Sequence, residues 1–181
     1  MPDLFDGQKL DRGAVPPKSE DKKTQIQAFM AGPANFATNV EKIIRFRQDI
    51  SLKWPSIEEH VGIFGLCWGG KVAILACGQG NEGQGRKLKA SGTAHPGGLD
   101  PEDARKTNVP HLLLASPGES ADKVAECKKI LSSPGYTGEA ITYHTMFHGF
   151  MGARANLEDE ANRNEYERGY KQVAEFFLKH L

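Results

Sequence analysis

The sequence predicts an α/β protein with a mostly parallel sheet flanked by helices. Short apolar runs at 61–66 and 111–115 indicate buried strands, and segments with apolar residues at helical spacing alternate with them. Strands that alternate with helices pair in parallel, because each helix returns the chain to the same end of the sheet. The 181 residues are enough for a core, and we expect a single domain over residues 1–181.

Two helices are expected before the first strand. Residues 24–30 begin a helix that Gly32 and Pro33 end, and the polar stretch before it is interpreted mainly as loop. Asn35 can cap a second helix, since its side chain accepts one of the free backbone N–H groups at a helix start. The apolar spacing of that helix continues until Pro55 stops it.

The rest of the chain alternates between strands and helices. Strands are expected at 61–66, 88–94, 111–115 and 140–146. Helices are expected at 71–77, 122–131 and 158–180. The Gly-rich segment 78–85 is interpreted as a flexible loop.

Composition excludes several classes of protein. The 23 basic and 23 acidic side chains give a formal net charge of zero, so no basic field indicates nucleic-acid binding. No apolar stretch approaches the length of a membrane span, and the N-terminus lacks the pattern of a secretion signal. The three cysteines, Cys67, Cys77 and Cys127, have neither an even number nor metal-site spacing. We therefore expect a reduced, cytoplasmic protein that binds neither nucleic acid nor membranes.

The pentapeptide Gly-Leu-Cys-Trp-Gly around Cys67 carries the strongest functional signal. It joins the expected strand 61–66 to the expected helix 71–77, with the thiol at the apex of the turn. Gly65 and Gly69 flank the cysteine, and so tight a turn is expected to exclude side chains at both positions. The following helix N-terminus is expected to lower the pKa of the thiol. The alternative is that Cys67 is a small buried apolar residue.

A thiol nucleophile needs a base, and the chain has six histidines. Parallel sheets carry their chemistry in the loops at the carboxyl ends of strands. That rule sets aside the histidines expected at strand starts, inside a strand or in the last helix, namely His60, His111, His144 and His180. His148 follows the strand 140–146 and is the predicted base, whereas His95 follows another strand and is expected to line the site.

An acid that orients the base is expected between Cys67 and His148 in the chain. Glu119 and Asp122 both follow the strand 111–115. We favour Glu119, because Asp122 is fully explained as an acidic residue in the first turn of the next helix. Either carboxylate would hold the imidazole tautomer rather than take its proton.

Substrate-binding candidates lie near the predicted base and nucleophile. Arg154 follows His148 by six residues and is placed to bind a substrate carboxylate, although a surface role explains it equally well. Phe150 and Trp68 would supply an apolar wall, or belong to the core. His95 completes the set as a pocket-lining or capping residue.

These residues resemble the dienelactone hydrolase family of α/β-hydrolases, in particular its eukaryotic-type branch. The matching segments are 1–7, 65–71, 94–96, 148–154 and 166–170. The resemblance implies an α/β-hydrolase fold, a triad of Cys, Asp and His, and hydrolysis of lactones or other activated esters. It implies neither a metal nor a cofactor. By position, Cys67 and His148 correspond to the family's nucleophile and base, and the backbone N–H of Trp68 corresponds to an oxyanion-hole donor.

Two departures from the family pattern affect these expectations. The family usually has an Asp where this chain has Glu119. The chain also begins at a point that several strands precede in family members, so the expected fold is N-terminally shortened. The loop after one of those strands supplies a second oxyanion donor, for which this sequence has no visible source. Losing one such donor costs on the order of a hundredfold in rate.

The sequence therefore supports two functions from different classes. The first is a hydrolase that cleaves a lactone or small activated ester through Cys67, with His148 as the base. The alternative is a non-hydrolytic relative that binds, or acts in another step on, a lactone-like or polyketide-like molecule. The missing second oxyanion donor predicts slow hydrolysis. A shortened sheet would leave the strand 61–66 with a free edge, which predicts a possible homodimer.

Overall fold

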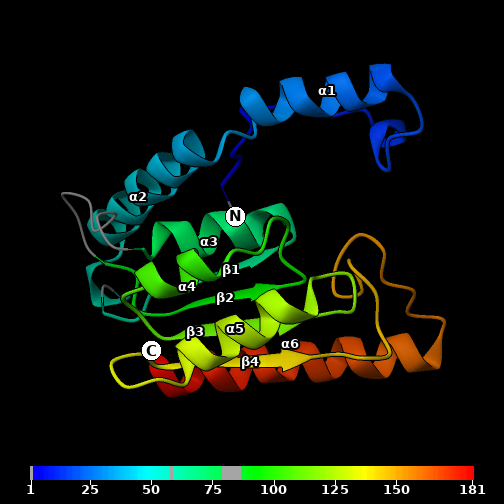
Figure 1. Ribbon diagram of the computed structural model, residues 1–181. Helices are drawn as coiled ribbons and strands as arrows, with labels where there is room; N and C mark the ends of the chain where they lie inside the picture. The colour runs from blue at the N-terminus through cyan, green and yellow to red at the C-terminus, as the bar shows by residue number, and fades with distance from the viewer. Residues whose placement is uncertain (1, 58, 79–86) are drawn as a thin grey trace.

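The computed structural model describes residues 2–57, 59–78 and 87–181. At its centre lies a parallel sheet with the strand order β1-β2-β3-β4. The strands are β1 (Ile63–Leu66), β2 (Ser91–Ala94), β3 (His111–Ala115) and β4 (Gly138–Thr142). A helix follows each strand, as Figure 1 shows, so the predicted α/β class with a parallel sheet is confirmed.

Helices cover both faces of this sheet. They are α1 (Glu20–Ala31), α2 (Phe36–Lys53), α3 (Trp68–Ala76), α4 (Pro101–Lys106), α5 (Ala121–Leu131) and α6 (Glu160–His180), with 3₁₀ turns η1 (Arg12–Ala14) and η2 (Pro55–Ile57). On one face, Phe176 of α6 shares a buried cluster with Leu112 and Leu114 of β3. On the other face, Leu113 shares a cluster with residues of α3, α4 and α5. Within the described residues, no helix combines the length and apolar character needed to cross a membrane.

The first two helices are capped by side chains at their N-termini. Ser19 Oγ accepts the Lys22 N–H at 3.3 Å, so α1 begins at Glu20 rather than at the predicted residue 24. Asn35 Oδ1 accepts the Thr38 N–H at 3.1 Å, which confirms the predicted cap of α2. The helix α2 ends at Lys53, two residues before Pro55, close to the predicted stop.

Other element boundaries differ from the sequence prediction. The helix α3 begins at Trp68, directly after Cys67, instead of at residue 71. The short helix α4 was missed, although Asp100 caps it and proline opens it. The strand β4 ends at Thr142, and the apolar residues that extended the prediction to 146 are buried in the following loop. The predicted loop 78–85 lies outside the described residues apart from its first residue.

A buried polar pair lies at the amino end of the sheet. His111, the first residue of β3, is 1% exposed, and its Nδ1 lies 2.7 Å from the hydroxyl of Ser91 at the start of β2. Burial lowers the pKa of His111 to about 4, so the ring stays neutral at pH 7. A neutral imidazole with a bonded nitrogen is an ordinary core residue, which agrees with setting His111 aside as a base.

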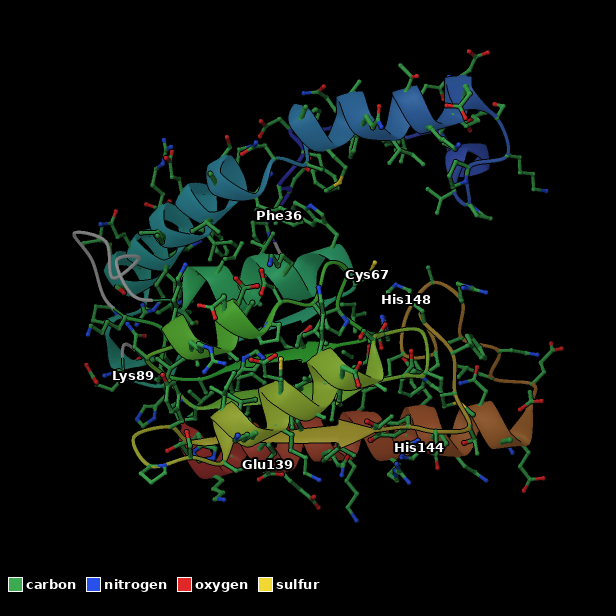
Figure 2. The ribbon with its side chains drawn as sticks, viewed as in Figure 1. Phe36, Cys67, Lys89, Glu139, His144 and His148 are labelled. Atoms are coloured by element: carbon green, nitrogen blue, oxygen red, sulfur yellow. The ribbon has the colours of Figure 1, made fainter. Side chains whose placement is uncertain are left out.

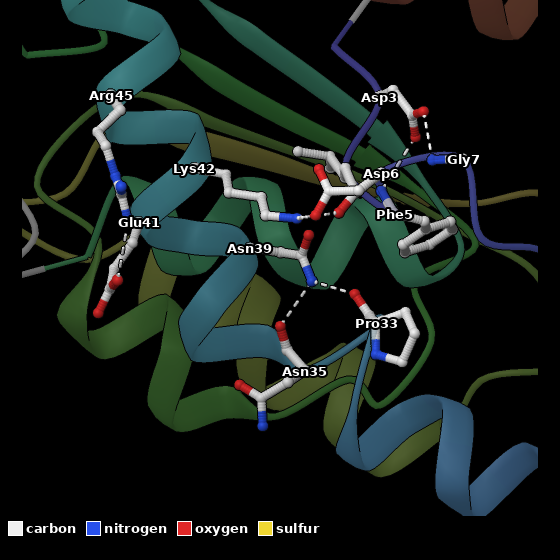
Figure 3. A network of polar contacts seen from close by, with 11 residues as sticks. Asp3, Phe5, Asp6, Gly7, Pro33, Asn35, Asn39, Glu41, Lys42 and Arg45 are labelled. Carbon is white, nitrogen blue, oxygen red and sulfur yellow. Dashed lines mark hydrogen bonds and ion pairs between the residues drawn. The ribbon is translucent and has the colours of Figure 1, made fainter.

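The segment before η1 folds back onto α2 and the start of α3. Lys42 Nζ on α2 donates to the Leu4 carbonyl at 2.8 Å and pairs with the Asp6 carboxylate at 2.7 Å, as Figure 3 shows. The ring of Phe5 lies against the ring of Trp68 with centroids 4.9 Å apart. The first residues of the chain are therefore held beside the turn that contains Cys67.

The strand β1 forms one edge of the sheet and pairs with β2. A groove of about 830 Å³ is lined by residues of β1, by Pro2 to Phe5 and by Cys67. The N-terminal segment borders this edge without forming a strand beside it. The free edge expected from the sequence is therefore present in the described residues.

Candidate active site

Cys67 lies at the carboxyl end of β1, in the turn that leads into α3. Its backbone adopts φ +52°, a left-handed conformation that is uncommon for residues other than glycine. The Cys67 N–H donates to the carbonyl of Ala94, and its own carbonyl accepts the N–H groups of Gly70 and Gly97. These bonds tie the strained turn to α3, to the end of β2 and to the loop after β2, so the thiol projects from a rigid support.

The turn requires two glycines, but they are not the two predicted. A Cβ at Gly65 would lie 2.1 Å from the Gly69 carbonyl oxygen, and a Cβ at Gly70 would lie 1.9 Å from Thr93 Oγ1. A Cβ at Gly69 would meet no atom within 4 Å. The steric argument therefore holds for Gly65 and is wrong for Gly69, because the tight contact occurs where α3 crosses β1 and β2.

A continuous chain of hydrogen-bonding contacts links three of the predicted residues. His148 Nε2 lies 3.2 Å from Cys67 Sγ, and His148 Nδ1 lies 2.7 Å from Glu119 Oε1. Figure 2 shows Cys67 and His148 together at one end of the sheet, with His144 well apart from them. The side chains come from the loops after β1, β3 and β4, as the rule about strand carboxyl ends predicts. His144 itself lies in the turn after β4 rather than inside a strand.

Of the two candidate carboxylates, Glu119 is the one that contacts His148. Its side chain is 3% exposed, and its Oε2 accepts the Ser116 N–H at 2.6 Å and the Ser116 hydroxyl at 2.9 Å. The other carboxylate oxygen is thereby turned toward His148. Asp122 lies exposed in the first turn of α5, as its helical interpretation predicts. Sequence reasoning missed Ser116, although Ser-x-x-Glu is the spacing of a capping box, in which the Glu side chain reaches back to the serine N–H.

The Cys67 thiol is stabilised in its protonated form. Burial is the largest influence and raises the pKa of Cys67, the Trp68 N–H lowers it, and the Glu119 carboxylate raises it again. Part of the residue reaches solvent, yet neighbouring atoms remove enough water from the sulfur to outweigh that N–H. The lowered pKa expected from the helix N-terminus is therefore wrong, and a base must take the proton before the sulfur can attack.

The backbone N–H of Trp68 donates to the Cys67 sulfur, and its role as an oxyanion-hole donor stays a prediction. Contacts with neighbouring segments hold the side chain of Trp68. Its Nε1 donates to the Ala34 carbonyl at 2.9 Å, and its ring stacks on Phe36 and contacts Phe5. The helix start that carries the donor is thus anchored to α2 and to the N-terminal segment, a contribution that sequence reasoning missed.

Two of the predicted substrate-binding residues lie inside the protein. His95 is 1% exposed and Phe150 is 0% exposed, so neither side chain is open to solvent. Phe150 belongs to the core cluster between the sheet and α6, which is the simpler of its two interpretations. His95 lies beneath His148, with the two ring centroids 5.1 Å apart.

Arg154 is exposed and packs back over the turn at Gly149. Its guanidinium lies 5.6 Å from the centre of the Phe147 ring, and the backbone N–H of Arg154 donates to the Gly149 carbonyl at 3.3 Å. Its role in binding a substrate carboxylate stays a prediction. Among the residues that the structure describes, no group of three or more His, Cys, Asp or Glu side chains is arranged to hold a metal ion.

Comparison with known proteins gives related sequences and solved structures with a similar fold. Two uncharacterized AIM2 family proteins of Schizosaccharomyces pombe are 30% and 27% identical to this chain over 98% of its length, which corresponds to 69% of each relative. The dienelactone hydrolase of Anabaena variabilis superposes with a TM-score of 0.61 at 15% identity, covering 90% of this chain and 68% of that one.

A second solved structure, named m3DLH, has a TM-score of 0.65 at 18% identity and covers 99% of this chain and 73% of its own. At these identities the two solved structures support the fold alone. The sequence profile of the dienelactone hydrolase family matches residues 1–181. The chain therefore belongs to the dienelactone hydrolase family.

Proposed function

We propose that this protein hydrolyses a lactone or a small activated ester, with Cys67 as nucleophile and His148 as general base. The observation that carries the proposal is the unbroken line of contacts from Glu119 through His148 to Cys67. A nucleophile, a base within reach and a third group that orients the base form the arrangement that covalent catalysis of acyl transfer needs. Membership of the dienelactone hydrolase family supports the same class of reaction.

The first step is attack of the sulfur on the substrate carbonyl. Because the thiol is protonated at rest, the S–H proton passes to His148 Nε2 as the C–S bond forms. Glu119 accepts the Nδ1–H and stabilises the imidazolium that results. The carbonyl oxygen becomes an oxyanion within reach of the Trp68 N–H.

The tetrahedral intermediate then breaks the bond to the alcohol oxygen. The imidazolium returns its proton to that oxygen, which leaves as an alcohol, or stays tethered if the substrate is a lactone. The acyl group remains on Cys67 as a thioester. A water molecule, deprotonated by His148, attacks the thioester carbonyl, and the thiol regains its proton as the acid is released.

The test is turnover of chromogenic acetate esters and of neutral and carboxylated lactones by wild-type protein and Cys67→Ala. We expect the variant to lose turnover by about four orders of magnitude or more, because no other group replaces the nucleophile. Its thermal midpoint should stay nearly unchanged, since Ala keeps the backbone strain and removes only a partly exposed atom.

Cys127→Ala is the matched control. This thiol is buried in α5, within a core cluster that does not include Cys67 or His148. Its loss should lower stability and leave kcat unchanged. Unaltered turnover by Cys67→Ala would contradict the proposal. A wild-type protein without turnover on the whole panel would instead favour the non-hydrolytic alternative.

A further inference from the structure

His95 combines two unfavourable features at one buried position. Its backbone has φ +38°, which is uncommon for a residue other than glycine. Its side chain is 1% exposed, and neither ring nitrogen has a hydrogen-bond partner among the described residues. Buried polar atoms nearly always have partners, and strained conformations persist where the surrounding structure and function require them. His95 therefore needs an explanation other than core packing.

The contacts of the His95 ring supply one. The ring meets His148 nearly edge to face, with an interplanar angle of 62° and centroids 5.1 Å apart. It also meets Phe150, with centroids 5.8 Å apart, and Phe150 is completely buried. His95 thus contacts both a buried core residue and the imidazole that contacts Cys67. It lies at the end of β2, where its N–H donates to the Leu114 carbonyl at 2.7 Å.

The bond to Glu119 alone does not fix the plane of the His148 ring. A hydrogen bond at Nδ1 fixes one atom, and the ring can still tilt about it, carrying Nε2 away from the sulfur. The His148 side chain is 31% exposed, so solvent faces part of the ring. The ring of His95 closes the buried side and restricts that tilt.

We propose that His95 is a positioning residue, whose ring holds the His148 imidazole in the plane that directs Nε2 at Cys67 Sγ. The inference rests on the proposed role of His148 as a base, and it explains why a ring is kept at a strained and unpaired position. Displacement of a reacting group by about 1 Å can cost on the order of a hundredfold in rate, so a support of this kind affects the reaction directly.

The support must also stay uncharged while His148 carries a proton. Burial first, and the nearby His148 second, lower the pKa of His95 to about 4, while Glu119 acts in the opposite direction. Cys67, His148 and Glu119 are the titratable groups gathered around this ring. At pH 7 the His95 ring is therefore neutral and adds no positive charge beside the imidazolium.

Two substitutions distinguish the role of the aromatic ring of His95 from the role of its two nitrogen atoms. His95→Asn tolerates a positive φ and keeps a polar side chain, but removes the ring. His95→Phe keeps a ring and removes both nitrogens. The readout is the rate at which iodoacetamide alkylates Cys67 as a function of pH, because the base affects this rate whether or not the protein hydrolyses esters. The other two thiols, Cys77 and Cys127, are buried.

We expect His95→Asn to slow alkylation at pH 7 by about tenfold and to shift the rate profile to higher pH, because a displaced Nε2 no longer takes the proton of a thiol whose pKa is already raised. In His95→Phe the rate should remain within about threefold of wild type. If the wild type hydrolyses an ester, kcat should follow the same order while KM stays within about twofold. If the variants show these alkylation rates but the wild type hydrolyses no ester, the result counts against the proposed function and not against the role of His95.

His111→Asn is the matched control, because His111 is equally buried and lies at the other end of the sheet. It should lower stability and leave the alkylation profile of Cys67 unchanged. A wild-type profile in His95→Asn would overturn the proposal, and so would equal impairment of the Asn and Phe variants.

If His95→Asn does not fold, the NMR signal of the His148 Nδ1–H in the wild type and in His95→Phe decides the question. One slowly exchanging signal in both proteins supports a fixed ring. Absence of that signal in the wild type, with the Glu119 bond intact, would overturn the proposal.

Discussion

The two ends of the sheet each contain a buried histidine, and the two histidines differ in hydrogen bonding and in backbone conformation. His111 at the amino end and His95 at the carboxyl end are both 1% exposed, and burial is the largest influence in lowering each pKa to about 4. His111 has a hydrogen-bond partner in Ser91, whereas neither nitrogen of His95 has one among the described residues. Of the two, only His95 adopts a positive φ.

The difference separates what stabilises the sheet from what the site requires. At the amino end, polar groups are paired and the backbone is relaxed, as in an ordinary core. At the carboxyl end, Cys67 and His95 both adopt positive φ, and a thiol, a carboxylate and two imidazoles lie close together. Such departures from local preference are expected where geometry serves chemistry.

Replacement of Glu119 by Gln disrupts the contacts from residue 119 through His148 to Cys67, while the side chain keeps its size and shape. The amide oxygen can still accept the Ser116 N–H, so the amide nitrogen then faces His148 Nδ1 and favours the wrong tautomer. We expect kcat/KM on an activated ester to fall by about 10²- to 10⁴-fold. Asp122→Asn, an exposed change in α5, is the control and should retain wild-type kinetics. Loss of activity only in Asp122→Asn would transfer the role of the acid to Asp122.

Alanine at Gly65 and at Gly69 compares the two sides of the strained turn. The new Cβ at Gly65 would overlap the Gly69 carbonyl at 2.1 Å, so we expect a loss of at least about 3 kcal/mol in the free energy of unfolding. The Cβ at Gly69 meets open space on α3, so Gly69→Ala should be neutral or stabilising by up to about 1 kcal/mol. Urea unfolding of both variants measures the contrast. Equal losses would show that the turn restricts both positions alike.

Acidification tests what the two buried histidines share. Each has a pKa of about 4 in the folded protein and near 6.5 when unfolded, so below pH 6.5 the unfolded chain binds protons that the folded protein excludes. Stability is therefore fully present above pH 6.5 and is lost as the pH falls toward 4, by about 1.4 kcal/mol per pH unit for each histidine. Urea unfolding between pH 7.5 and 5 measures the slope, and His111→Phe should halve it. A flat profile over this range would mean that the two rings are hydrated in the folded protein.

The sequence predicted some elements well because their signals are local. The strand at 111–115 was predicted with its observed boundaries, since Pro110 and a run of apolar residues mark it. The end of β4 was misplaced because Tyr143 and Met146 are buried by the tertiary fold in a loop. The six-residue helix α4 was missed because it is too short to show an apolar period.

The proximity of Cys67, Glu119 and His148 followed from chain order and from the rule that parallel strands end on one edge. Their surroundings did not follow from any local pattern. The raised pKa of Cys67 depends on how much water the folded protein removes from the sulfur. The burial of His95 depends likewise on the layer of residues between the sheet and α6.

The helix α1 has a consequence for how unfolding of this protein is measured. It contains no buried residue, and it is held by the Ser19 cap, by the contact of Phe29 with Phe5 and by a partly exposed ion pair between Lys22 and Asp11. A helix of 12 residues with so little tertiary support is marginal in water, so its amide hydrogens will exchange through local opening. Ellipticity will then begin to fall on heating while the tryptophan fluorescence, which comes from Trp54 and Trp68, is still native. The two signals will give different midpoints, and a two-state fit to either one will understate the cooperativity of the sheet.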